Sequence, residues 1–273
     1  MPATIREAIG DELYVSISQI KAYLLCPRQF ELRYVRGVEP EFVPRALAFG
    51  IAFHAALAHH YIDLRDLHVA PTTEKLIETF RRAWALKLDG SVPVQGEDDE
   101  PKVDPLDLAA KMLGKFVENA KATEQDLVVD AVEQPFSVTL VDPDTGEVLE
   151  EKLVGAIDLV AHEGDLTIVV EHKSAAKKYG VDQLRYDLQP TAYQLAMHEL
   201  GWSPIGLRYQ IVTKTKSPQV QIENIVRDQQ DEDDFLRVAF GVLKAIDAGV
   251  SYPVRGWQCR SCPYQTACAK KTS

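Results

Sequence analysis

Apolar residues recur at helical spacing through most of the first 125 residues of the chain. Side chains three and four positions apart form one apolar face per segment, which is the period of a helix packed on a core. Near the start, Ser18 is a suitable N-cap and Pro27 suits the first turn of a second helix. The longer helices are predicted over 45–66, 73–89 and 106–123, with a surface loop over 90–105.

At Leu127 the apolar period changes from helical to alternating, which is typical of strands with one buried face. Turn residues at 142–146 and 163–165 separate the alternating segments. Strands are predicted over 127–141, 147–161, 166–173, 207–213 and 218–226, and helices over 187–200 and 231–248.

The order of these elements predicts an α/β protein made of one integrated domain. A helical N-terminal subdomain is expected over 1–125, a sheet core over 126–228, and a helix with a cysteine-rich segment over 229–273. The cysteines lie near opposite ends of the chain, so a shared metal would require the tail to fold back onto Cys26.

Composition and charge narrow the class of protein. The chain has 273 residues, of which 46% are hydrophobic and 26% charged, as is usual for a globular protein in water. It contains no run of 18 apolar residues and no apolar leader, so we expect no membrane span and a cytoplasmic location. A net charge of −11 argues against a passive nucleic-acid coat. The acidic stretches at 97–100 and 228–234 are expected to be solvated surface.

An apolar strand ends in charged residues at Glu171-His172-Lys173. Because side chains alternate across a strand, Glu171 and Lys173 share one face. The residues expected on the opposite face, toward a core, are Leu166, Ile168 and Val170. Such an apolar strand is expected to be central in its sheet. An exposed Glu–Lys surface pair is the simpler explanation of the two charges taken alone.

A two-residue turn at Gly164-Asp165 would fold this strand back onto the preceding one. The hairpin places Asp158 opposite Glu171, with Cβ atoms about 5 Å apart. Two carboxylates this close repel unless a divalent cation lies between them. Lys173 would then hold a scissile phosphate or an attacking water. A metal, a water and a cation are what phosphodiester hydrolysis needs, so Asp158, Glu171 and Lys173 are the candidate catalytic residues.

A histidine in the predicted helix 45–66 is a candidate for a further metal ligand. The neutral imidazole of His54 suits this role, although His59 and His60 are nearby competitors and a lone helical histidine is usually packed or solvated. Glu133, in the first long strand, is a weaker candidate for the same ion.

Other polar residues suit contacts with a polynucleotide. Gln189 and Tyr193 lie four positions apart, on one face of a helix that begins near Pro190. They are able to bond a phosphate or a base, although a half-buried tyrosine at a helix start explains the pattern equally well. Basic residues that would form a positive strip along a DNA backbone are Lys177, Lys178, Arg185, Lys214 and Lys216, each also explained as solvated surface.

Four cysteines are present, and their spacing indicates one metal site. Cys259, Cys262 and Cys268 place three thiols within ten residues, and Cys26 would complete a set of four. Structural zinc fits four thiolates, but its sites usually show two paired Cys-x-x-Cys motifs. One distant cysteine with a compact triple better suits an iron–sulfur cluster. Free buried thiols are the third explanation.

With these residues assembled, the sequence resembles the PD-(D/E)XK nuclease superfamily. Within it, the chain is similar to the RecB-like branch with an iron–sulfur cluster, which includes the AddB nuclease domain and the CRISPR-associated RecB-like exonucleases. The one departure is Ile157, which stands before Asp158 in place of proline. The segments that carry the resemblance are Ser18 to Phe30, Gly50 to His54, Gly155 to Asp158, Glu171 to Lys173, Gln189 to Tyr193, and Cys259 to Cys268.

The resemblance implies a restriction-endonuclease-like core, in which helices flank a mixed central sheet. It implies Mg²⁺ or Mn²⁺ held by His54, Asp158, Glu171 and the backbone carbonyl of His172, with Lys173 as the catalytic lysine. Gln189 and Tyr193 would contact DNA, and the cysteines Cys26, Cys259, Cys262 and Cys268 would hold a [4Fe–4S] cluster.

Family members cut DNA mostly from its ends, often as single strands, so an exonuclease is expected. Its partners would be DNA and proteins of CRISPR adaptation or of recombination. Two alternatives stay open: a non-catalytic module that binds DNA ends or assembles a complex, and a structural protein with a zinc site.

Overall fold

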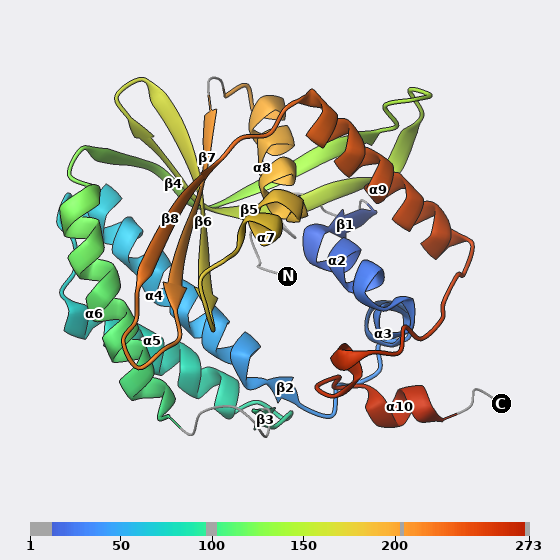
Figure 1. The fold of residues 1–273 in the computed structure, drawn as a ribbon, viewed down its shortest axis with the longest axis horizontal. Helices are drawn as coiled ribbons and strands as arrows, with labels where there is room; N and C mark the ends of the chain where they lie inside the picture. Colours follow the sequence, from blue (N-terminus) through green and yellow to red (C-terminus); the bar gives the residue numbers. More distant parts are fainter. Residues whose placement is uncertain (1–12, 97–102, 203–204, 271–273) are drawn as a thin grey trace.

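The computed structural model describes residues 13–96, 103–202 and 205–270, so the acidic stretch at 97–100 lies outside the described residues. A mixed six-stranded sheet forms the centre of the molecule (Figure 1). Its strand order is β1-β5-β6-β7-β8, and β4 pairs with the other edge of β5. The strands are β1 (Tyr14–Ser16), β4 (Leu127–Val141), β5 (Val148–Glu163), β6 (Leu166–Ala175), β7 (Ile205–Thr213) and β8 (Val220–Ile225).

Helices cover both faces of this sheet (Figure 1). One face carries α4 (Arg45–Leu67), α5 (Thr73–Leu88) and α6 (Pro105–Thr123). The other carries α2 (Ile17–Leu25), α8 (Leu188–Glu199) and α9 (Gln229–Asp247). The shorter elements are β2 (Val43–Pro44), β3 (Val94–Gln95), α3 (Pro27–Phe30), the π-helix η1 (Glu31–Val35), α7 (Val181–Tyr186), the 3-10 helix η2 (Trp257–Cys259) and α10 (Gln265–Ala269).

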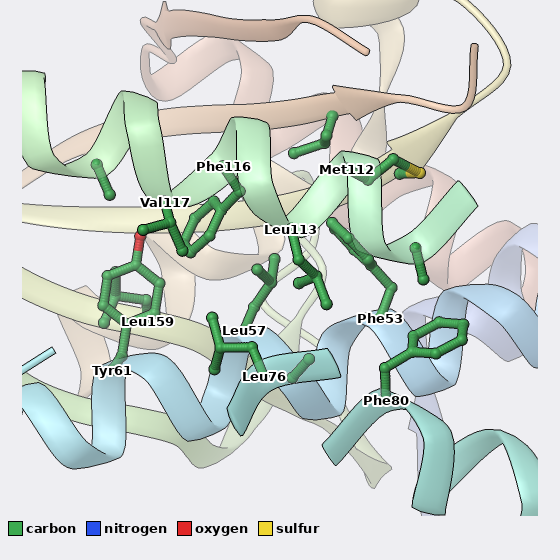
Figure 2. Packing of buried hydrophobic residues seen from close by; sticks show 14 of the residues in the cluster. Phe53, Leu57, Tyr61, Leu76, Phe80, Met112, Leu113, Phe116, Val117 and Leu159 are labelled. Carbon is green, nitrogen blue, oxygen red and sulfur yellow. The ribbon is translucent and has the colours of Figure 1, made fainter. Parts of the chain in front are cut away.

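The two helical layers each close a hydrophobic core against the sheet. Figure 2 shows the first core, where Phe53 and Leu57 of α4 meet side chains of α5 and α6. Leu159 of β5 belongs to this cluster and is fully buried. The period-2 alternation of β5 sends Val160 to the second core, beneath α2, α8 and α9. Buried positions on both faces explain why the central strands are almost continuously apolar.

The strand β6 changes partners partway along its length, and this change creates the site. It pairs antiparallel with β5 from the turn at Gly164 as far as Val170, which lies opposite Leu159. Beyond that point β6 continues only beside β7, in parallel, to Ala175. The next residue of β5 after this separation is Asp158, which therefore faces the point where the two strands diverge.

Most of the predicted elements are confirmed, with three corrections. Helix α2 begins after Ser16 rather than Ser18, because Ser16 and Gln19 form a capping box in which each side chain accepts the other's backbone N–H. The helix α7 was not predicted. Leu166 is 41% exposed because it is the first residue of β6, next to the turn, whereas Ile168 and Val170 are buried as expected. No helix in the described ranges is both long and apolar enough to cross a bilayer.

Candidate active site and cysteine pocket

The candidate active site lies where β6 separates from β5. The backbone N–H of His172 donates to Asp158 Oδ2 over 2.8 Å, and this bond replaces the strand pairing that ends one residue earlier. The hairpin register predicted from the sequence is confirmed, because Leu159 opposite Val170 makes Asp158 and Glu171 the next positions along the two strands. The acidic side chains are thereby brought to one place.

His54 reaches this place from α4. Its Nδ1 lies 3.6 Å from Asp158 Oδ2. Although burial disfavours a charged ring, the carboxylate of Asp158 raises the pKa of His54 above its ordinary value. The two competing histidines lie elsewhere: His59 contacts Thr79 and Asp63, and His60 packs against Phe116 in the core.

Glu133 was the weaker candidate for a metal ligand in the sequence, and the structure places it near His54 and Asp158. One potential ligand atom from each of His54, Glu133 and Asp158 lies within 4.8 Å of the other two. Glu133 lies on β4 between Val132, paired with Leu159, and Gln134, paired with Ile157, so it is opposite Asp158 across the strand pair. Pairing of β4 with β5 was the signal that would have identified it.

The conformation and charge of Glu133 are both unusual. Its φ of 52° is left-handed, which costs free energy at a residue with a side chain and is found most often at functional sites. Partial burial, together with the charge of Asp158, raises the pKa of Glu133 to about 7. A cation placed among these acidic groups would offset both the burial and the repulsion.

Glu171 and Lys173 form an ion pair on the face of β6 that they share. Helix α8 completes the contacts, because Lys173 Nζ donates to Gln189 Oε1 over 3.0 Å and Gln189 Nε2 donates to the Tyr193 hydroxyl over 2.9 Å. That hydroxyl in turn donates to Glu171 Oε2 over 2.6 Å. The four residues therefore close a ring of hydrogen bonds between β6 and α8.

The charges of this ring depend on one another. Burial and the neighbouring charge of Asp158 raise the pKa of Glu171, against the opposing effects of Lys173 and Tyr193. Burial disfavours the Lys173 ammonium, but the charge of Glu171 raises its pKa and keeps it protonated. In Asp158 the burial penalty is outweighed by His54, so its pKa is lowered and it is a carboxylate. The site thus holds one carboxyl group with a lowered pKa, Asp158, and one with a raised pKa, Glu171, beside the ammonium group of Lys173.

The ring of His172 points away from Glu171, into the opposite core. It stacks on Tyr61 of α4, with ring centroids 5.3 Å apart and an interplanar angle of 12°. Burial lowers the pKa of His172 to about 4, so the ring is neutral. The ring also meets the His54 ring edge-on, with centroids 6.5 Å apart, but it is the backbone of His172 that bonds Asp158. The backbone is the part that the resemblance assigned to the metal.

Gly155 leaves room for an aromatic ring beneath the site. A Cβ atom built at this position would lie 2.5 Å from Phe136 Cζ, closer than any side chain can pack. The Phe136 ring meets the Tyr193 ring edge-on at 6.0 Å. The missing side chain of Gly155 thus lets Phe136 support the tyrosine that contacts Glu171.

The predicted basic strip lies on the surface beyond the end of β6. Lys177 and Lys178 are exposed in the segment between β6 and α7, and Arg185 is exposed on α7, where its guanidinium lies over the Tyr186 ring. Lys216 is exposed after β7, whereas the half-buried Lys214 lies over the Phe49 ring. The structure leaves their contact with DNA as a prediction.

All four cysteines line one pocket, formed by the ends of the chain. Cys26 follows α2, and the other three come from the C-terminal segment, together with Gln29, Leu32, Val254 and Tyr264. Burial and the other three thiols raise the pKa of Cys262. The donor set fits a metal that binds thiolates, because a cation there would reverse this effect and favour deprotonation.

Backbone contacts hold the C-terminal segment against the N-terminal helices. The N–H of Arg28 donates to the Tyr252 carbonyl over 3.1 Å, and the N–H of Glu41 donates to the Pro263 carbonyl over 2.8 Å. The Glu41 carboxylate accepts from the N–H of Thr266 over 2.8 Å. The fold-back of the tail onto the region of Cys26, which a shared metal requires, is therefore present.

Comparison with known proteins gives matches at the level of family and fold. The sequence profile of the PD-(D/E)XK nuclease superfamily matches residues 14–269. A crystal structure from Eubacterium rectale, of a protein provisionally named an exonuclease, superposes with a TM-score of 0.58 at 14% identity, covering 100% of this chain and 96% of that one. SSO0001 aligns with a TM-score of 0.39 at 14% identity, over 94% of this chain and 96% of its own. Among curated proteins, no significant match exists.

Proposed function

Because this chain belongs to the PD-(D/E)XK nuclease superfamily, whose members are metal-dependent nucleases, we propose that it is a deoxyribonuclease that degrades DNA from its ends. The observation that carries the proposal is the placement of Asp158, Glu171 and Lys173 at the point where β5 and β6 separate. Single-stranded DNA ends are the proposed substrate, in keeping with the RecB-like branch that the sequence resembles.

The residues of the site fit a divalent cation. Carboxylate oxygens and an imidazole are suitable donors for Mg²⁺ or Mn²⁺. We assign the ion to His54, Asp158, Glu171 and the His172 carbonyl, with Glu133 as a further ligand because its carboxylate lies near His54 and Asp158. A bound ion would lower the pKa of a coordinated water and neutralise charge on the phosphate.

The chain's own residues perform the remaining tasks. Lys173 holds a fixed ammonium group beside the carboxylates, where it would attract the scissile phosphate and stabilise the charge that develops on it. Gln189 and Tyr193 hold Lys173 and Glu171 in position through the hydrogen-bond ring, and their outer edges would contact DNA. Lys177, Lys178 and Arg185 would contact the phosphates farther along the strand.

We further propose that Cys26, Cys259, Cys262 and Cys268 bind a [4Fe–4S] cluster that fastens the tail to the N-terminal helices. The shared pocket supports a metal but suits zinc as well. An absorption spectrum of anaerobically purified protein separates the two, because Zn²⁺ is d¹⁰ and gives no band at ~400 nm. A colourless protein with one equivalent of zinc would overturn the cluster.

The nuclease activity is tested with single-stranded DNA labelled at either end, in the presence of Mn²⁺. Wild-type protein should release short products from linear DNA, and Lys173→Ala should abolish the release. Lys152→Ala is a matched control, because Lys152 lies on β5 of the same sheet and its ammonium donates to Thr139 Oγ1 over 2.8 Å, away from the proposed site. Circular single strands should survive if the enzyme requires an end. Binding without cleavage by intact protein would replace this proposal with the non-catalytic alternative.

A further inference from the structure

Asp187 lies outside the expected set of site residues, yet its carboxylate contacts three elements at once. It is the N-cap of α8, where Oδ1 accepts the N–H of Gln189 over 3.1 Å. The same oxygen pairs with the Lys21 ammonium of α2 at 2.5 Å. The second oxygen, Oδ2, accepts the hydroxyl of Tyr209 of β7 over 2.6 Å. Its side chain is only 12% exposed.

These contacts lead directly to the candidate catalytic lysine. Gln189 Oε1 accepts from Lys173 Nζ at 3.0 Å and lies 3.5 Å from Lys21 Nζ. Two ammonium groups on one side therefore turn the amide oxygen toward Lys173 and the amide NH₂ toward the Tyr193 hydroxyl. The reversed orientation of the amide would set a donor against both lysines. Lys21 thus fixes the orientation of Gln189, and Asp187 fixes Lys21.

Charge explains why a carboxylate is needed at this place. Lys21 and Lys173 share the oxygen of one side chain, so their like charges repel. The negative charge of Asp187 offsets this repulsion, and its ion pair with Lys21 is a charge-assisted hydrogen bond. An uncharged residue would leave Lys21 free to swing toward solvent, since its side chain is 38% exposed.

We propose that Asp187 is a positioning residue, which acts with Lys21 and Tyr209 to hold Gln189, and through it the Lys173 ammonium, in the catalytic orientation. The inference rests on the proposed nuclease function and adds a second layer of residues to that same site. Lys21 lies on α2, and Cys26 directly follows this helix. The positioning contacts would therefore connect the cysteine pocket to the catalytic lysine through one short helix.

The test separates positioning from helix capping. Asp187→Asn keeps the N-cap, since asparagine caps a helix as well as aspartate does, but it removes the charge that holds Lys21. We expect kcat for DNA cleavage to fall roughly 10- to 100-fold with KM unchanged, because a small displacement of a catalytic group costs this much. The thermal midpoint should fall no further than in Lys21→Met, because both variants lose the same ion pair. Lys21→Met should give the same loss of kcat, and Lys21→Arg should retain activity by pairing with Asp187.

Asp228→Asn provides the matched control. Asp228 caps α9 in the same way, with its Oδ1 accepting the N–H of Asp231 over 3.0 Å, and α9 contributes no residue to the proposed site. This variant should cleave at the wild-type rate. The double variant Asp187→Asn/Lys21→Met should be no slower than either single variant, because both changes remove one interaction.

A second measurement does not depend on cleavage. In ¹⁵N-labelled protein, the side-chain ammonium signal of Lys173, identified by its loss in Lys173→Met, should shift in Asp187→Asn and stay fixed in Asp228→Asn. An unchanged Lys173 signal, or wild-type kcat in Asp187→Asn, would overturn the positioning role. A wild-type protein that cuts no DNA would instead overturn the proposed function, and the ammonium signal would still decide the role of Asp187.

Discussion

The two candidate metal sites of this molecule are built in opposite ways. The carboxylate site is formed by strands β4, β5 and β6 and helices α4 and α8, and hydrogen bonds connect several of its residues before any ion is bound. The cysteine pocket is formed mainly by the irregular segment after α9. As far as residue 270, the regular structure of this segment consists of the short helices η2 and α10. Its thiols make few hydrogen bonds: Cys259 Sγ donates to the Val254 carbonyl over 3.7 Å, and the backbone of Tyr264 bonds the Cys262 thiol.

The carboxylate site is therefore held in place by the fold itself, whereas the cysteine pocket would need a bound metal to hold it. In the carboxylate region the hydrophobic cores hold the strands, so the site residues are free to serve chemistry. In the cysteine region few apolar residues are buried, and metal–thiolate bonds would supply the missing free energy. Substitutions in the first region should therefore affect catalysis, whereas substitutions in the second should affect folding.

The largest expected effect is the loss of a cysteine ligand. Cys262→Ser should lower the free energy of unfolding by on the order of 5 kcal/mol or more, because metal binding and folding are coupled. Thermal unfolding and limited proteolysis would show early release of the segment after residue 250. Ser261→Ala is the neighbouring control. A Cys262→Ser protein as stable and as protease-resistant as wild type would show that the tail needs no metal.

Asp158→Asn should instead lower the rate of cleavage and have little effect on stability. An asparagine oxygen still accepts the His172 N–H. The lost charge relieves repulsion by Glu133 and Glu171 but also removes the attraction to His54, so these opposing changes should leave the thermal midpoint of ion-free protein close to that of wild type. Cleavage should nevertheless fall by at least ~100-fold, because a metal ligand is lost. Asp130→Asn on β4, which removes a carboxylate charge 2.9 Å from His162, is the control for rate. A large drop in the midpoint of Asp158→Asn would contradict the proposed division between the regions.

Acid should lower the free energy of unfolding through His60, a buried histidine on α4. Burial lowers the pKa of His60 from 6.5 to about 4. Between these values the unfolded chain binds a proton that the folded chain does not, so stability falls as the pH decreases from 6.5 toward 4. The full effect is at most about 3 kcal/mol. The unfolding free energy of His60→Leu, measured over this range, should decline less steeply than that of wild type; parallel curves would exclude His60 as the cause.

The two glycines near the active site should respond differently to alanine. A Cβ at Gly155 would collide with Phe136, so Gly155→Ala should cost about 1–3 kcal/mol and slow cleavage by disturbing Tyr193. At Gly50 the nearest atom is Ser174 Oγ at 3.8 Å, an ordinary contact. Gly50→Ala should therefore stabilise α4 by up to about 1 kcal/mol. Chemical denaturation measures both; equal effects would show that the strand beneath the site is not tightly packed.

The sequence predicted those parts of the molecule whose cause is local. The boundaries of β4 were predicted to the residue, because its alternating period begins sharply at Leu127 and ends at the turn after Val141. The placement of Asp158 beside Glu171 followed from a short turn, which fixes register over a few residues. Helix α2 was displaced by two residues because Ser16 and Ser18 are both suitable caps, and only the Gln19 contact selects the first.

The parts that were missed or only weakly indicated depend on contacts between distant segments. Glu133 was a weak candidate from the sequence, and its place near Asp158 depends on the pairing of β4 with β5 and on α4, which brings His54 to the same place. Asp187 is similar, because Lys21 lies 166 positions away in the chain. Its significance required knowledge of how α2 packs against α8. A single sequence does not contain such information in any periodic form.

The cysteine pocket also determines how the molecule would respond to mechanical force. If one cluster joins Cys26 to the tail, tension between residues 13 and 270 would pass along β1 and α2, cross the cluster, and leave through Cys268. Tension would also load the hydrogen bonds between β1 and β5, whereas β4 and β6 to β8 lie outside that route. The force needed to separate the two ends of the chain would then be set by a metal–thiolate bond rather than by the sheet.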